Sequence, residues 1–305
     1  MTVVLSYPAR PPWLDPAAFP FHSRFCDLDD ARMHYVDEGR GPTLLLVHGS
    51  PMWSFMYRHA IATLRSRFRC IAVDLPGLGL STAPLRRGHA HEDAALRLTD
   101  FVRALDLKDM VLAVHATAGP AALAMAVGET PRLRGLVISN TFAWPLDGDP
   151  RLAFFVRLVS SRLFALFNVG LNALAHVTAR IGRRNGRFDP AEREAILGPY
   201  RDRQARRHLQ NLLYGVRVER ERFAALEREL SGLAHLPTLL LYGAHDNGYR
   251  AGFVDRWRSL LPDHRLALLP EAGHFPFEDA PEEATAALGR WLDELERPRS
   301  HTAGR

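Results

Sequence analysis

The stretch Met110-Val111-Leu112-Ala113-Val114-His115-Ala116-Thr117-Ala118-Gly119-Pro120-Ala121-Ala122-Leu123 decides the fold of this 305-residue chain. Its first six residues are largely apolar, which predicts a strand buried in a parallel sheet. An Ala- and Leu-rich run follows directly and predicts a helix, with Gly119 permitting a tight turn. A strand that turns sharply into a helix raises the residue at the turn above the edge of the sheet. The N-terminus of the helix then points free backbone N–H groups toward that residue.

This strand–turn–helix geometry is that of a nucleophile elbow, whose apex residue attacks the substrate. In either plausible register the apex is Ala116 or Thr117. Alanine carries no attacking atom, and a threonine hydroxyl needs an adjacent base to activate it. The register fits Ala116 better, which leaves Thr117 as a minor alternative nucleophile.

The composition is that of a globular protein, with 47% hydrophobic and 24% charged residues and a formal net charge of +5. Acidic residues are interspersed with the basic ones, which favours a mixed solvated surface over a nucleic-acid-binding one. The two cysteines, Cys26 and Cys70, give neither a disulfide framework nor a metal site. Residues 1–12 lack the pattern of a signal peptide, and arginines interrupt the apolar residues 152–177. We therefore predict a cytoplasmic protein without a transmembrane segment.

Alternating apolar runs and helical periodicities predict an α/β fold, a mostly parallel sheet flanked by helices. After Phe142 the strand-like runs stop and helical periodicity continues to about Leu233. A helical insertion at this point would cover the carboxyl ends of the strands as a cap. We assign residues 1–141 and 234–305 to the core domain and 142–233 to the cap domain. Further strands are expected near 24–28, 32–36, 43–47, 69–73, 133–139, 237–242 and 265–269, and core helices near 55–64, 92–105, 253–261 and 281–295.

The sequence His48-Gly49-Ser50 leaves the predicted strand 43–47 and precedes a helix. A backbone turn here can approach a reacting centre, so the N–H of Ser50 is a candidate oxyanion donor. The N–H of Thr117 would be its partner. For His48 we favour a structural role, in which the ring fixes the loop by hydrogen bonding.

Asp246 and His274 each follow a predicted strand, and they come after the elbow in the order nucleophile, acid, base. Asp246 would accept the Nδ1–H of His274, and His274 would use Nε2 as a general base. The competing interpretations are a helix cap for Asp246 and a structural loop residue for His274. The fourteen histidines show no close ligand spacing, so we predict no metal and no cofactor.

Several segments together resemble the haloalkane-dehalogenase branch of the α/β-hydrolases over essentially the whole chain, which implies an α/β-hydrolase fold with a cap. In that branch the elbow commonly reads His-Asp-Trp-Gly-Gly-Pro. The resemblance therefore puts Ala116 in the place of the nucleophilic Asp and Thr117 in the place of Trp. It also puts Ser50 where the branch has an Asn after His-Gly. The segments that carry the resemblance are 33–38, 48–58, 74–81, 140–145, 243–246 and 273–281.

These departures argue against halide release, because the Trp indole and the Asn amide hold the departing halide in that branch. The sequence is also similar to the β-lactone decarboxylases of long-chain olefin biosynthesis, through residues 11–14 and 21–25. Those relatives keep an Asp nucleophile, lose carbon dioxide to form a cis-olefin, and need no halide site. The resemblance implies an apolar substrate, and we expect its pocket to be lined by Trp53, Phe142, Trp144 and Phe275.

Ala116 has three interpretations: an inactivating Asp→Ala substitution, divergence to a non-covalent lyase or oxygenase that uses the Asp246–His274 pair, or a catalytically silent binding protein. We favour an inactivated β-lactone decarboxylase. The alternatives are a haloalkane dehalogenase or an epoxide hydrolase. The expected partner is a small hydrophobic substrate, and the Arg-rich face of the cap leaves docking to a biosynthetic enzyme open.

Overall fold

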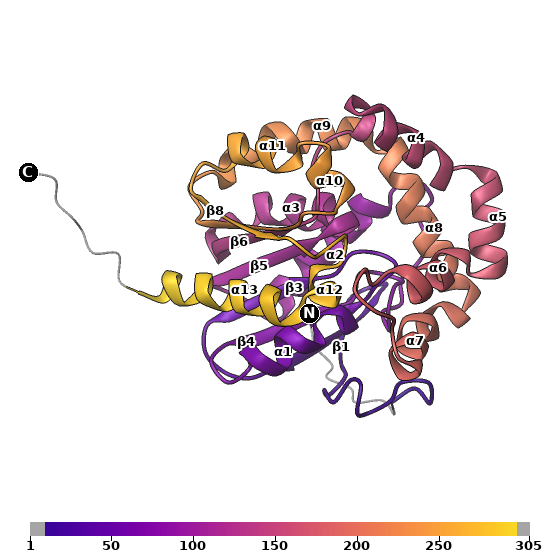
Figure 1. Cartoon of the computed structure of the whole chain (residues 1–305), viewed down its shortest axis with the longest axis horizontal. Coiled ribbons are helices and arrows are strands. Elements are labelled where there is room, and N and C mark those ends of the chain that lie inside the picture. Colours follow the sequence, from indigo (N-terminus) through magenta and orange to yellow (C-terminus); the bar gives the residue numbers. More distant parts are fainter. Residues whose placement is uncertain (1–9, 298–305) are drawn as a thin grey trace, which may run out of the picture.

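The structure, a computed structural model, describes residues 10–297 and is built on one eight-stranded sheet (Figure 1). The strand order is β1-β2-β4-β3-β5-β6-β7-β8, and β3 to β8 are mutually parallel where they pair, whereas β1 and β2 run antiparallel at one edge. The prediction of a mostly parallel sheet is therefore confirmed. The strands are β1 (Arg24–Asp27), β2 (Arg32–Glu38), β3 (Thr43–Val47), β4 (Arg69–Val73), β5 (Met110–His115), β6 (Leu133–Ser139), β7 (Thr238–Gly243) and β8 (His264–Leu269).

The central strands are the most apolar because helices cover both of their faces. Every residue of β5 and β7 is buried, and β3 is buried from Leu44 to Val47. In the paired register, Val47 of β3 lies beside Val114 of β5, and His115 lies beside Ser139 of β6. The carboxyl ends of these strands therefore meet at one edge of the sheet, where the elbow and the loops after β3, β6 and β7 begin.

Helices of the core cover the two faces of the sheet (Figure 1). One face packs on α1 and α13, through side chains such as Ile61 and Trp291. The other packs on α2, α3 and α11, through side chains such as Phe101, Leu123 and Trp257. The bounds are α1 (Arg58–Leu64), α2 (Ala90–Ala104), α3 (Gly119–Gly128), α11 (Phe253–Leu260), α13 (Pro281–Glu296) and the short α10 (Asn247–Arg250) and α12 (Pro276–Asp279).

Between β6 and β7 the chain forms helices only, and they arch over the carboxyl ends of the strands (Figure 1). Side-chain oxygens of Asp149, Ser161, Asp189 and Asp202 accept backbone N–H groups in the first turns of four of them. The division of the chain into a core domain and a cap domain stays a prediction. The helices are α4 (Pro150–Val159), α5 (Arg162–Leu171), α6 (Ala173–Ile181), α7 (Pro190–Leu197), α8 (Arg203–Val218) and α9 (Arg220–Glu229).

Within residues 10–297, no single helix is long and apolar enough to cross a membrane. The pair α4 and α5 passes such a test together by length and composition, but it is bent by 55°.

Candidate active site

The elbow after β5 has its apex at Ala116. This residue has φ +49°, in the left-handed region that costs an L-residue roughly 1–2 kcal/mol. The chain then enters a 3-10 turn (Ala116–Ala118) and α3. A side chain at Gly119 would overlap the Thr141 hydroxyl, and one at Gly49 would overlap the Ala116 methyl group. The loops are therefore packed tightly around the apex, and the positive φ distinguishes Ala116 from Thr117 as the apex residue.

Thr117 and Ser50 contact each other directly beside the apex. The Ser50 N–H donates to Thr117 Oγ1 at 3.0 Å, and the two hydroxyl oxygens are also 3.0 Å apart. An oxyanion that used the Ser50 N–H would have to displace the threonine hydroxyl from it. The neighbouring His48 is buried, and its Nε2 accepts the N–H of Leu75 at 2.9 Å. This bond fits the predicted structural role of His48.

Asp246 and His274 form the bonded pair that the chain order predicts. Asp246 Oδ1 lies 2.6 Å from His274 Nδ1, and the carboxylate is almost fully buried. The other oxygen, Oδ2, accepts the N–H groups of Gly248 and Tyr249 at the start of α10. Asp246 therefore caps a helix and steers an imidazole at the same time, so the two interpretations of this residue are compatible.

His274 keeps 45% of its side-chain surface exposed toward the pocket. Removal from bulk water lowers its pKa, but the hydrogen bond and the negative charge of Asp246 raise it by more, so the net pKa lies above its usual value. Below the ring, burial and the charge of His274 hold the pKa of His115 well below its ordinary value. The pair can therefore accept and hold a proton at His274 while His115 stays neutral.

Asn140 holds the His274 loop in place, a role that sequence reasoning missed. It follows β6 with φ +42°, and its Nδ2 donates to the carbonyls of Gly273 (2.8 Å) and His274 (2.9 Å). Its Oδ1 accepts the N–H of Gly243 at 3.1 Å. One side chain thus ties the ends of β6 and β7 to the loop after β8. An asparagine directly after a buried strand was the available signal.

A pocket of about 240 Å³ lies between this site and the cap. Its floor contains Ala116, Thr117, Asp246 and His274, so the three predicted catalytic positions share one cavity. The wall is mostly apolar and comes from the loop after β6 and from α4, α8 and α11, with the side chains Phe142, Leu152, Phe155, Val156, Leu213, Val216 and Phe253.

Of the four aromatic residues expected to line the pocket, Phe142 does so and the other three do not. Trp53 is fully buried in the core, and its indole N–H donates to the Ala195 carbonyl at 2.8 Å. Trp144 packs against Trp257, with ring centroids 4.7 Å apart. Phe275 is buried against two histidine rings. The predictions for Trp53, Trp144 and Phe275 were wrong because large aromatic side chains next to a site more often fill the core beneath it.

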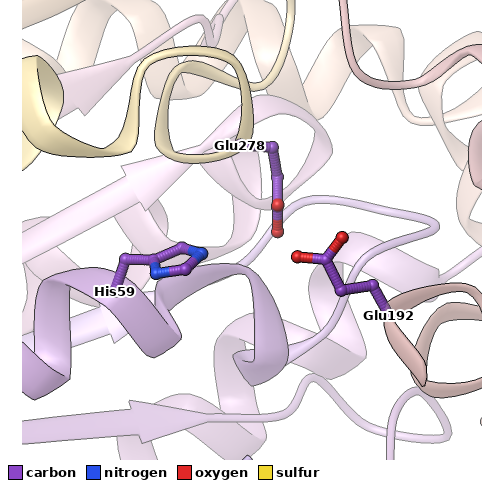
Figure 2. Close-up of side chains that lie close together, drawn as sticks. All are labelled: His59, Glu192 and Glu278. Carbon is purple, nitrogen blue, oxygen red and sulfur yellow. The ribbon is translucent and has the colours of Figure 1, made fainter. Parts of the chain in front are cut away.

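The described residues also bring potential metal ligands together at a second place. His59 of α1, Glu192 of α7 and Glu278 of α12 have ligand atoms within 4.8 Å of one another (Figure 2). Both carboxylates, however, are already bonded to arginines. Arg58 contacts Glu278 at 2.5 Å and Glu192 at 2.6 Å, and Arg183 contacts both at 3.0 Å. Two positive charges match two negative ones, so we interpret the cluster as an ion-paired link between cap and core.

Comparisons with known proteins agree with this fold. A family model described as the alpha/beta hydrolase fold matches residues 42–281, and the chain therefore belongs to the α/β-hydrolase family. Its relatives include haloalkane dehalogenase 2 of Mycobacterium tuberculosis, 38% identical over 288 residues that cover 90% of this chain and 96% of the relative. A cis-3-alkyl-4-alkyloxetan-2-one decarboxylase of Shewanella oneidensis is 26% identical and covers 91% of this chain and 90% of the relative.

Solved structures support the fold alone. The haloalkane dehalogenase DbeA of Bradyrhizobium elkani superposes on this chain with a TM-score of 0.79 at 20% sequence identity. The superposition covers 90% of this chain and 98% of the DbeA chain. By sequence identity the chain is a haloalkane-dehalogenase-like member of the family, with weaker similarity to the decarboxylases.

Proposed function

We propose that the pocket binds a hydrophobic β-lactone and is built for ring opening with loss of carbon dioxide, but that Ala116 deprives this chain of the covalent step. One observation carries the proposal: the methyl group of Ala116 lies at the apex of a strained elbow, in the same cavity as the bonded Asp246–His274 pair. A carboxylate attached there would face that cavity, with His274 available for proton transfer.

The polar groups around the apex favour a lactone over a haloalkane, although the haloalkane dehalogenase is the more similar relative. A departing halide needs N–H donors to hold it. Here the Ser50 N–H is occupied by the Thr117 hydroxyl, and the Trp53 indole N–H is occupied by a backbone carbonyl. A β-lactone splits into an alkene and carbon dioxide, so its atoms balance without a halide or a water molecule. The oxetan-2-one in the name of the Shewanella oneidensis relative is such a ring.

The apolar wall of the pocket supports a hydrophobic substrate. Side chains of α4 and α8 close over the floor, and burying each methylene of an alkyl substituent there would stabilise the complex by about 0.8 kcal/mol. The unaltered protein, with Ala116, should therefore bind an alkyl-substituted β-lactone without turning it over.

The test restores the nucleophile. Ala116→Asp should gain turnover on a cis-3,4-dialkyl β-lactone, measured as alkene and carbon dioxide, whereas the near-isosteric control Ala116→Asn should not. In the Ala116→Asp background, His274→Ala should remove that gain. Chloride or bromide release from a haloalkane by Ala116→Asp, without lactone turnover, would reverse our choice of substrate, and diol formation from an epoxide would favour an epoxide hydrolase.

A second candidate, a catalytically silent binding protein, is favoured by the absence of an attacking atom at the apex of the unaltered chain. It predicts tight binding of an apolar ligand and no turnover by Ala116→Asp on a lactone, a haloalkane or an epoxide. Lactone binding by the unaltered chain, measured by calorimetry, combined with turnover by Ala116→Asp would exclude it.

A further inference from the structure

The outer helices of the cap expose large apolar side chains to solvent. Figure 1 shows α4 and α5 in succession along the margin of the molecule, outside α8, with α6 turning back toward α8 after them. Each of the most prominent side chains on them is more than half exposed, and three neighbouring helices carry all of them. They are Phe154, Phe155, Leu163, Leu166, Leu171 and Ile181.

The same stretch of chain is exclusively basic. Residues 150–188 contain seven arginines and no aspartate or glutamate, although the whole chain has almost as many acidic as basic residues; of the seven, Arg183 is paired with Glu192 and Glu278. Arg151 and Arg157 on α4, Arg162 on α5 and Arg180 on α6 are all exposed. Positive charge thus borders the apolar side chains without acidic residues among them.

A groove of about 460 Å³ runs beside this apolar face, between α5 and α8. Four arginines line it, Arg87, Arg162, Arg207 and Arg217, and no acidic residue is among its lining residues. Its α5 side is apolar, through Ala165 and Val169, so it can hold an anionic group next to an aliphatic one. The helix α5 that supplies Arg162 to the groove also carries the exposed Leu163, Leu166 and Leu171.

We propose that the α4–α6 face of the cap docks on an anionic lipid membrane. The apolar side chains would enter the boundary between headgroups and acyl chains, and the arginines would contact lipid phosphates. A ten-residue helix is about 15 Å long, half of the roughly 30 Å hydrocarbon core. The 55° bend between α4 and α5 therefore suits two helices that lie in the interface. A protein partner would need acidic residues to match this border, whereas an anionic membrane supplies both negative charge and an apolar phase.

Phe155 connects this face to the candidate active site, because it lines the pocket and is also 55% exposed. An apolar substrate dissolved in the membrane could therefore enter the pocket past α4. This consequence rests on the proposed function, but the docking itself does not.

Co-sedimentation of the full chain with vesicles tests the docking. We expect binding to vesicles of phosphatidylcholine with 30% phosphatidylglycerol, weak binding to phosphatidylcholine alone, and release as salt is raised. Arg157→Gln with Arg162→Gln should lower the partition coefficient about fivefold per arginine. Phe154→Ser with Leu166→Ser should lower it at every salt concentration.

Matched controls lie on the core. Leu96→Ser removes an exposed leucine of α2, and Arg290→Gln removes an exposed arginine of α13, and neither should change binding. No binding to either vesicle would overturn the proposal, as would equal binding by the cap variants and the controls. A concentration-dependent dimer that Leu166→Ser abolishes, without vesicle binding, would instead assign the face to a second copy. Because vesicle binding needs no turnover, it can succeed or fail independently of the lactone assay.

Discussion

Replacing Asp246 separates its two tasks, because one oxygen bonds His274 and the other caps α10. Asparagine caps helices about as well as aspartate, so Asp246→Asn should keep the bonds from Gly248 and Tyr249. The asparagine variant loses the negative charge beside His274, however, and its side-chain NH₂ group would face Nδ1 of His274. Asp246→Ala loses both functions.

The expected losses of stability follow from the two sets of hydrogen bonds that Asp246 makes. A charge-assisted hydrogen bond contributes about 1.5–3 kcal/mol, and the lower end applies because the imidazole of His274 is 45% exposed. An N-cap contributes about 1 kcal/mol. We therefore expect Asp246→Asn to lower the free energy of unfolding by about 1.5 kcal/mol at pH 5.5, and Asp246→Ala by about 2.5 kcal/mol.

The pH dependence gives the sharper test. The folded pKa of His274 lies above the 6.5 expected for the unfolded chain, so its stabilising contribution is fully present below pH 6.5 and is lost as the pH rises through the folded pKa. In Asp246→Asn the remaining causes are burial, which lowers the pKa of His274, and the more weakly acting charge of Asp279, which raises it, so this pKa should fall. The stability difference from the unaltered chain should thus shrink between pH 5.5 and pH 8.

Guanidinium unfolding across this pH range, with the His274 ring titrated by NMR, measures both effects. A stability difference independent of pH, or an unchanged titration midpoint in Asp246→Asn, would refute the assigned role of this carboxylate. Equal losses for the asparagine and alanine variants would show that the cap bonds do not survive in Asp246→Asn.

Three further substitutions, two of them compared with a control, test the framework of the site. In the Ala116→Asp background, Asn140→Ala frees the loop that carries His274 and should lower lactone turnover about 10- to 100-fold, with little effect on lactone affinity measured by calorimetry. Glu278→Ala leaves a buried arginine charge unmatched and should lower the free energy of unfolding in urea by about 3–5 kcal/mol. Asp293→Asn removes one partner of an exposed ion pair and should lower it by less than about 1 kcal/mol. Gly119→Ala should destabilise the folded protein by about 1–3 kcal/mol, because the added methyl group would overlap the Thr141 hydroxyl. Gly128→Ala should stabilise it slightly, because no atom lies within 4 Å of the added methyl group. Thermal unfolding of the two variants measures the difference.

Apolar runs predicted the sheet because burial on both faces leaves little choice of residue type. The run from Met110 to His115 is a strand with the predicted bounds, and the strand predicted at 43–47 is also matched residue for residue. The antiparallel pairing of β1 with β2 left no such signal, because pairing partners depend on contacts between distant segments.

The candidate site could be predicted where its chemistry restricts both the type of a residue and its place directly after a strand. Asp246 and His274 were found in this way, and the structure brings them within 2.6 Å. The pocket wall was less predictable, since an aromatic residue near a site can face either the cavity or the core. Trp53 faces the core, whereas Phe155 of α4, for which we made no prediction, lines the pocket.

The conformation of Ala116 shows that the scaffold, and not the side chain, sets the elbow. Alanine gains nothing from φ +49°, whereas aspartate and asparagine tolerate this region more readily. The Thr141 hydroxyl donates to the Ala116 carbonyl at 2.5 Å, and side chains at Gly49 or Gly119 would collide with their surroundings. These contacts impose the strain from outside, so they persist whichever residue occupies position 116. A site shaped by its neighbours can therefore lose its nucleophile and still keep the position that a carboxylate would need.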